Sequence, residues 1–161
     1  MTNKVHYVIQ GSEEWRQLRS GKVTASRVSD VVAKIKSGGY SASRANYMAE
    51  LVLERLTGKP TEGFITQDML IGTAREPDAR AEYVLKMRTP VEQIGFVDHP
   101  SMPMTGASAD GFIGEDGIVE FKCPKPATHL ATLRGKTISG DYHTQVMWNL
   151  ACNPTRKWLV S

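Results

Sequence analysis

Residues 106–124 read GASADGFIGEDGIVEFKCP, and the fold of the chain follows from this stretch. Its central Gly-Glu-Asp-Gly, at 114–117, is typical of a tight turn that joins two antiparallel strands. We expect those strands at 104–113 and 117–123. The stretch therefore predicts a β-hairpin with residues 108–112 lying opposite residues near 120.

Three charged side chains meet on this predicted hairpin. Residues two apart on a strand point to the same face of a sheet, so Glu120 and Lys122 project together. Val119 and Phe121 then face the core. The turn brings Asp110 back beside the other two charged residues, which gives two carboxylates and one ammonium at one end of a small sheet.

This trio suits the hydrolysis of a phosphodiester. Two carboxylates bind a hard cation such as Mg²⁺, which keeps waters and substrate oxygens as its other ligands. The cation activates water and stabilises charge at phosphorus, and a neighbouring lysine can orient or deprotonate that water. A simpler interpretation also fits, because Glu120 and Lys122 could form an ordinary surface ion pair and Asp110-Gly111 an ordinary turn.

Helical patterns surround the hairpin on both sides. Val28, Val31, Val32 and Ile35 fall at helical spacing after Thr24, a plausible N-cap. The linker-like residues 36–41 read as a mobile loop. The remaining expected elements are a helix at 43–56 with Tyr47 and Leu51 on one face and Gly58 and Pro60 closing it, a helix at 67–87 distorted or restarted at Pro77, a weak strand at 92–98, a helix at 141–151 ended by Asn153-Pro154, and a strand from Arg156 to Ser161.

The order of these elements predicts the fold class. Helices, a short sheet, a helix and a strand indicate an α/β (α+β-like) domain with a mixed sheet flanked by helices. The 161 residues suffice for a single domain over 1–161. Because the last strand begins just before the end of the sequence, we expect that further C-terminal elements of such a domain are missing.

Composition adds limits rather than a function. The chain is 40% hydrophobic and 23% charged with a net charge of +3, which permits a phosphate-rich partner without requiring one. No apolar run is long enough to cross a bilayer, and the N-terminus has no apolar signal core, so we expect a cytoplasmic protein with no membrane partner. Cys123 and Cys152 are expected to be reduced thiols. Neither they nor His99, His129 and His143 have zinc-ligand spacing.

Several blocks, in order, resemble one nuclease family. Asp110 followed by Glu120-Phe121-Lys122 fits the PD-(D/E)XK pattern, and the chain is similar from about Trp15 onward to the lambda exonuclease and YqaJ-like viral recombinase family. Besides the predicted metal site at Asp110-Gly111 and Glu120–Pro124, the similar blocks are Trp15–Arg19 with Thr24–Ser26, Gly72–Arg80, and Tyr142–Val146 with Trp148. The resemblance implies a restriction-endonuclease-like core.

The resemblance also implies roles for single residues. Asp110, Glu120, Glu76 and the backbone carbonyl of Phe121 would bind Mg²⁺, for which Mn²⁺ can substitute; Lys122 would position the attacking water, with Gln145 beside the site. A further group would bind the 5′-phosphate of the substrate: Arg19, Ser26 and Ser108. Each of these also has an ordinary interpretation, as a solvated helix charge, a surface amide, or a capping or turn serine.

Two positions depart from the family pattern. Ala109 replaces the proline of the PD half, a position that mainly shapes the turn. After Lys-Cys-Pro, where a further basic phosphate contact is expected, either Lys125 or His129 could take that role.

The resemblance therefore predicts a Mg²⁺-dependent exonuclease of phage-type recombination that degrades linear double-stranded DNA from the 5′ end. It further implies a phage or prophage origin, a homotrimeric ring and a single-strand annealing protein as partner. A PD-(D/E)XK endonuclease and a catalytically silent DNA-binding protein are the alternatives. The phosphate-binding group argues against the first. The acidic pair argues against the second, since without a metal it would repel DNA.

Overall fold

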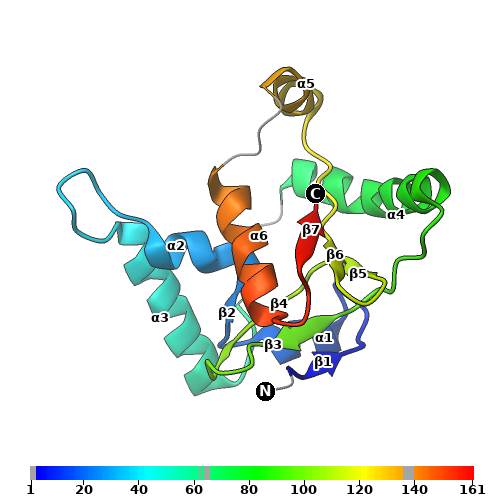
Figure 1. The fold of residues 1–161 in the computed structure, drawn as a ribbon. Coiled ribbons are helices and arrows are strands. Elements are labelled where there is room, and N and C mark those ends of the chain that lie inside the picture. Colours follow the sequence, from blue (N-terminus) through cyan, green and yellow to red (C-terminus); the bar gives the residue numbers. More distant parts are fainter. Residues whose placement is uncertain (1–2, 62, 64–65, 136–139) are drawn as a thin grey trace.

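The structure of the chain is a computed structural model that describes residues 3–61, 63, 66–135 and 140–161 (Figure 1). Two short sheets lie side by side, and helices pack around them. The helices are α1 (Glu13–Arg19), the 3₁₀ turn η1 (Ala25–Arg27), α2 (Val28–Val32), α3 (Ala42–Thr57), α4 (Gln67–Met87), α5 (Pro126–Gly135) and α6 (Gly140–Cys152). In the part of the chain described, no helix is long and apolar enough to span a membrane.

The first sheet has four strands in the order β1-β3-β4-β2: β1 (Val5–His6), β3 (Phe96–Asp98), β4 (Thr105–Ala107) and β2 (Val23–Thr24). β4 pairs antiparallel with β3 and parallel with β2. Phe96 and Val97 are fully buried, so this sheet supplies much of the core. The expected strand at 92–98 is confined to its last three residues, while Glu92 forms only an isolated bridge.

The second sheet contains the predicted hairpin. β5 (Gly111–Ile113) pairs antiparallel with β6 (Gly117–Val119), and β7 (Trp158–Val160) adds to β6 in parallel. The turn at 114–117 is confirmed, since Ile113 lies opposite Gly117. The strand expected at the end of the sequence is also present.

The strands at 104–113 and 117–123 are shorter than expected. The first is two strands in different sheets, because residues 108–110 carry the chain from one sheet to the other. The second ends at Val119, since the N–H group of Phe121 donates to the carboxylate of Asp110 instead of to a neighbouring strand. Both breaks fall beside the charged residues singled out from the sequence.

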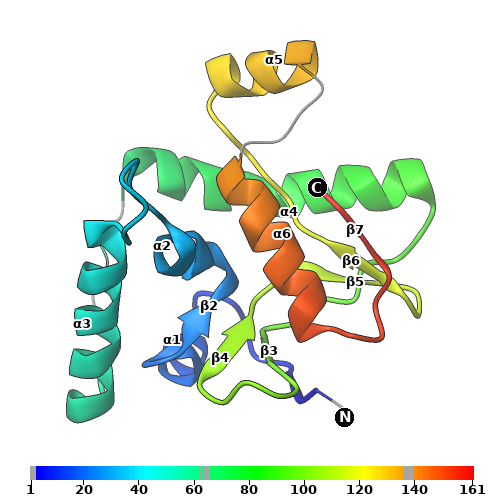
Figure 2. The same cartoon turned by 60° about the vertical axis from the view of Figure 1, so that its left-hand side comes forward.

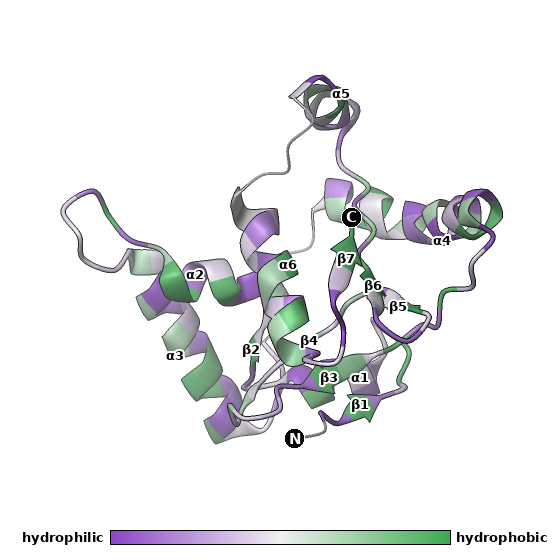
Figure 3. Ribbon diagram, viewed as in Figure 1, coloured by the Kyte–Doolittle hydropathy of each residue, from purple (hydrophilic) through white to green (hydrophobic). Residues whose placement is uncertain are grey.

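Most of the predicted helices are confirmed. Helix α3 buries Tyr47 and Leu51 and ends at Gly58, whose φ of 66° is left-handed. Helix α4 has the expected bounds but runs through Pro77 without restarting. None of its residues is buried, and hydrophilic and hydrophobic segments alternate along it (Figure 3).

Two helical predictions were incomplete. The helix expected through Ile35 ends at Val32, because Lys34 and Tyr40 form a bridge that turns the chain back. Thr24 precedes η1 but its side chain makes no capping hydrogen bond. Helices α1 and α5 were not expected at all, since both are short and lack a clear apolar period.

Helix α6 joins the two sheets. It crosses between α2 and β7 in Figure 1, and Figure 2 shows it lying over the strands with α4 behind. It packs on η1 and β4, and the indole of Trp148 donates to the carbonyl of Gly106 at 3.1 Å. Cys152, at its end, is fully buried and, like Cys123, is a free thiol.

The close approach of β3 and β4 predicts the effect of a single methyl group. A Cβ on Gly106 would overlap the ring of Phe96 and the carbonyl of Val97. We expect Gly106→Ala to lower the free energy of unfolding by about 1–3 kcal/mol, the usual cost of overpacking. Urea denaturation measures it. Gly72→Ala is the control, because a Cβ there makes only ordinary contact and should leave stability unchanged or raised. Equal stability of both variants would contradict this packing.

Candidate active site

The hairpin brings the two predicted metal ligands together. Gly111 lies opposite Val119, and the N–H of Asp110 donates to the carbonyl of Val119 at 3.1 Å. Asp110 therefore stands next to Glu120 across the ladder. One oxygen of Asp110 accepts the N–H of Phe121, which fixes the carboxylate against the chain just beyond β6.

Glu120 is the buried centre of this group, with only 4% of its surface exposed. Lys122 donates from Nζ to Glu120 Oε1 at 2.8 Å, and Gln145 donates from Nε2 to the same oxygen at 2.6 Å. Lys122 also donates to Gln145 Oε1 at 3.1 Å. Three residues predicted from different parts of the sequence thus form one hydrogen-bonded cluster.

The sequence did not single out Asn149, which also contacts the cluster. Its amide donates from Nδ2 to Glu120 Oε2 at 3.1 Å, and the residue is fully buried. Asn149 follows Gln145 by four residues on α6, so both lie on one helix face. That spacing is the signal that could have identified it.

Glu76 reaches the same region from α4. It lines a groove together with Lys122, Phe121 and Tyr142. Burial raises the pKa of Glu76, and the nearby charge of Glu120 raises it further, while Lys122 and Arg80 lower it. The structure therefore brings a third carboxylate within electrostatic range of the first two.

The carboxyl group of Asp110 is strongly perturbed by its surroundings. Burial and repulsion from Glu120 raise its pKa from 3.8 to about 7, against the opposing hydrogen bond from Phe121. Glu76 adds to the increase and Lys122 reduces it. An acidic cluster with this much uncompensated repulsion is the environment that a divalent cation neutralises.

The donor set fits a hard cation that needs few protein ligands. Within residues 3–61, 63, 66–135 and 140–161, no three His, Cys, Asp or Glu side chains already form a closed metal cage. Mg²⁺ does not require one, because it is held by one or two carboxylates and keeps several waters. Asp110 and Glu120, with the carbonyl of Phe121 and with Glu76 across the groove, match that demand.

The predicted phosphate-binding residues are also close together. Arg19 donates from Nη1 to Ser108 Oγ at 2.9 Å, and its guanidinium stacks on Trp15, with Cζ 4.1 Å from the ring centroid. The indole of Trp15 donates to the same Ser108 hydroxyl at 3.1 Å. Ser108 was expected to share a strand with Asp110; instead it lies between β4 and β5, where these contacts hold it.

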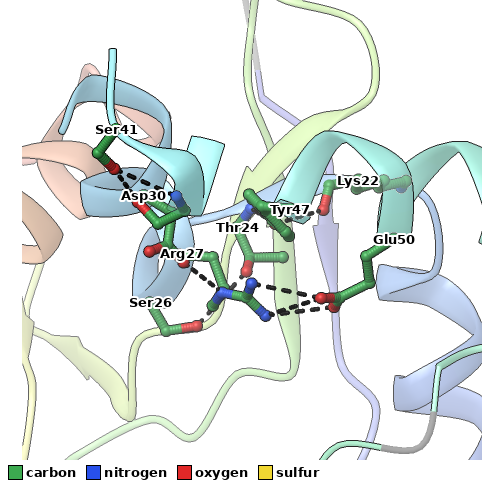
Figure 4. Close-up of polar contacts among 9 residues, drawn as sticks. Lys22, Thr24, Ser26, Arg27, Asp30, Ser41, Tyr47 and Glu50 are labelled. Atoms are coloured by element: carbon green, nitrogen blue, oxygen red, sulfur yellow. Dashed lines mark hydrogen bonds and ion pairs between the residues drawn. The ribbon is translucent and has the colours of Figure 1, made fainter. Parts of the chain in front are cut away.

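Ser26 completes the group from another direction. Its exposed side chain lines one pocket with Arg19, and Thr24 Oγ1 lies 3.4 Å from its hydroxyl. Figure 4 shows Ser26 beside Arg27, whose guanidinium is engaged by Asp30 and Glu50. Arg27 is thereby already paired with acids, whereas the contacts of Arg19 among the described residues are with the Ser108 hydroxyl and the Trp15 ring.

Lys125 and His129, the two candidates for a further basic phosphate contact, lie in different places. Lys125 lines the groove beside Lys122 and forms an exposed ion pair with Asp68 at 2.7 Å. His129 is exposed on α5. Neither is among the residues that line the pocket of Arg19 and Ser26.

Known proteins share the sequence pattern and the fold of this chain. The family model of the YqaJ-like viral recombinase domain matches residues 14–156. The structure is similar to the crystal structure of an alkaline exonuclease from Laribacter hongkongensis (LHK-Exo), with a TM-score of 0.83, 42% sequence identity, and coverage of 92% of this chain and 71% of that chain. LHK-Exo in complex with dAMP gives the same values. A search of curated proteins found no match.

The raised pKa of Asp110 predicts a pH-dependent stability. The unfolded carboxyl group ionises near 3.8 and the folded one near 7, so the folded chain binds more protons between these values and its stability falls as the pH rises through them. Asp110→Asn removes this loss. In chelator at pH 8 we expect the variant to be more stable than the unmodified protein, on the order of a few kcal/mol.

Urea denaturation at pH 5 and pH 8 measures this difference. Asp78→Asn, an exposed residue of α4, is the control and should change neither value. A variant Asp110→Asn that is less stable than the unmodified protein at pH 8 would contradict the assigned repulsion.

Proposed function

The chain belongs to the YqaJ-like viral recombinase family, and from this premise we propose that it is a Mg²⁺-dependent exonuclease that degrades linear double-stranded DNA from the 5′ end. The main observation in support is that Glu120 is hydrogen-bonded to both Lys122 and Gln145 and lies beside Asp110. Its structural relative LHK-Exo is an alkaline exonuclease, which supports the nuclease class.

Each residue of the cluster has a distinct task in this proposal. Bound Mg²⁺ supplies Lewis-acid stabilisation of the charge that develops at phosphorus. Asp110 and Glu120 hold it, with the Phe121 carbonyl and Glu76 as further oxygen donors. Lys122, whose ammonium lies 2.8 Å from Glu120, would orient the attacking water by donating a hydrogen bond to it. Gln145 fixes the Lys122 ammonium through its own side-chain oxygen.

The electrostatics of Asp110 suit work at alkaline pH. Its pKa near 7 in the free chain means that the carboxylate is fully ionised only above neutrality. A group that must be ionised to bind a cation then favours activity at higher pH. LHK-Exo is an alkaline exonuclease, which supports activity at higher pH. Its complex with dAMP, a nucleoside monophosphate, supports the release of single nucleotides.

The group of Arg19, Ser26 and Ser108 favours an exonuclease over an endonuclease. Arg19 and Ser26 line one pocket, and Ser108 is hydrogen-bonded to Arg19. A terminal phosphate carries more charge than an internal one, so a charge-assisted pocket can distinguish a chain end. Burial lowers the pKa of Arg19 to about 10, so the side chain is still cationic at neutral and mildly alkaline pH. The homotrimeric ring and the annealing partner expected from the resemblance stay predictions.

The cluster predicts that cleavage requires both a divalent cation and Lys122. EDTA should abolish degradation of linear duplex DNA and Mg²⁺ or Mn²⁺ should restore it. Lys122→Ala should slow cleavage by about 10²–10⁴-fold while leaving binding to DNA ends intact. Gel analysis of duplexes labelled at each end measures rate and direction.

Lys86→Ala serves as the matched control, because Lys86 is exposed on α4 and forms an ion pair with Glu82, away from the cluster. It should cleave at the unmodified rate. Full activity in excess chelator would contradict the metal-dependent mechanism. Near-normal activity of Lys122→Ala would show that Lys122 has no role in it.

The phosphate pocket predicts a preference for 5′-phosphorylated ends. Anchoring the end places the next phosphodiester over the acidic cluster, which is catalysis by positioning. We expect 5′-phosphorylated duplex to be degraded faster than 5′-hydroxyl duplex. Arg19→Ala should slow only the phosphorylated substrate, so the hydroxyl substrate is an internal control for folding. Equal initial rates on both substrates in the unmodified protein would refute the pocket.

A further inference from the structure

We propose that Asn149 is a positioning residue that fixes the carboxylate of Glu120, so that Oε1 alone is presented to the metal. The inference rests on the proposed metal-dependent function. It concerns a residue that neither the hairpin nor the PD-(D/E)XK pattern singles out.

The two oxygens of Glu120 have different neighbours. Oε1 accepts hydrogen bonds from Lys122 and Gln145, which are both partly exposed, and Lys122 lines the groove. Oε2 accepts from Asn149, which is 0% exposed. Oε2 therefore points into the protein interior and Oε1 toward the site.

The cation that now contacts Oε1 is the ammonium of Lys122. It lies on the side from which a metal would approach and neutralises the buried carboxylate. A hydrogen bond at Oε2 does not compete with ligation at Oε1. Asn149 can thus keep the carboxylate in one orientation both before and after a cation binds.

The asparagine amide is poorly suited to a purely structural role. Its Oδ1 atom is buried and has no hydrogen-bond partner within the part of the chain that the structure describes. An unsatisfied buried acceptor costs stability, which offsets part of what the hydrogen bond to Glu120 contributes. What the amide does provide is an uncharged donor to Glu120, which holds the carboxylate without a second cation.

The backbone around Asn149 is held independently of the site. Asn153 donates from Nδ2 to the carbonyl of Asn149 at 2.8 Å and accepts from Asn3 at 3.0 Å. Gln145, one turn earlier, donates a hydrogen bond to the other oxygen of Glu120. Helix α6 therefore brings both amides to the carboxylate as one rigid unit, and residues that orient a metal ligand in this way set its affinity.

The test compares metal binding with stability. Asn149→Leu removes the donor and keeps a γ-branched shape, and Asn149→Ser removes it by shortening the side chain. Asn153→Ser is the matched control, because Asn153 is also buried and hydrogen-bonded near the end of α6 and its recorded bonds do not involve Glu120. Calorimetric titration with Mn²⁺ gives affinity, and thermal unfolding in EDTA gives stability.

We expect both Asn149 variants to bind Mn²⁺ about 10–100-fold more weakly than the unmodified protein, the usual effect of losing a residue that orients a metal ligand. Cleavage should need correspondingly more Mn²⁺ for half-maximal rate. Asn149→Leu should unfold in EDTA at a lower temperature than the unmodified protein, because the buried Oε2 atom of Glu120 loses its hydrogen bond. Asn153→Ser should keep its affinity for Mn²⁺. If Asn149→Leu does not fold, Asn149→Ser decides the question.

Unchanged Mn²⁺ affinity in the folded variants would overturn the role of Asn149 while leaving the nuclease proposal intact. An equal loss in Asn153→Ser would overturn it as well, because the effect would then come from α6 as a whole. If the unmodified protein binds no Mn²⁺, the metal mechanism itself fails, and the role of Asn149 with it.

Discussion

A carboxylate buried to 4% exposure, that of Glu120, is the constraint on which this part of the structure depends. An ionised group in such a place is tolerated only when it is paired and hydrogen-bonded. Lys122, Gln145 and Asn149 meet that need, and two of these three come from α6. These hydrogen bonds connect α6 to the residue that follows β6. If the second sheet moved relative to α6, the Glu120 carboxylate would lose hydrogen bonds or become exposed.

The same constraint accounts for the unusual state of Asp110. Lys122 and the two amides bind its neighbour Glu120. Among the described residues, the carboxylate of Asp110 accepts one backbone N–H and is repelled by two other carboxylates. This asymmetry between two adjacent acids stores unfavourable electrostatic energy at one point of an otherwise stable hairpin. A site that destabilises the free chain is expected where a ligand later supplies the compensation.

The sequence predicted the hairpin and its charged residues because a turn motif and the strand period are local properties. Helix bounds were equally accessible for α3 and α6, whose apolar faces repeat clearly. The break between the two sheets at residues 108–110 could not be predicted from the sequence. It depends on Trp15 and Arg19, some ninety residues away, which bind the Ser108 hydroxyl. Asn149 escaped notice for a similar reason, since only the tertiary fold reveals that its amide meets Glu120.

That long-range contact also joins end recognition to chemistry. Ser108 is bound by α1 and lies two residues before Asp110, so the segment that carries a metal ligand is anchored by the residues proposed to hold the terminal phosphate. The indole of Trp15 holds the same hydroxyl, so this anchor does not depend on Arg19 alone. The residues proposed to seat the DNA end and the carboxylate proposed to bind the metal thus share one short segment of backbone, which sets the distance between them.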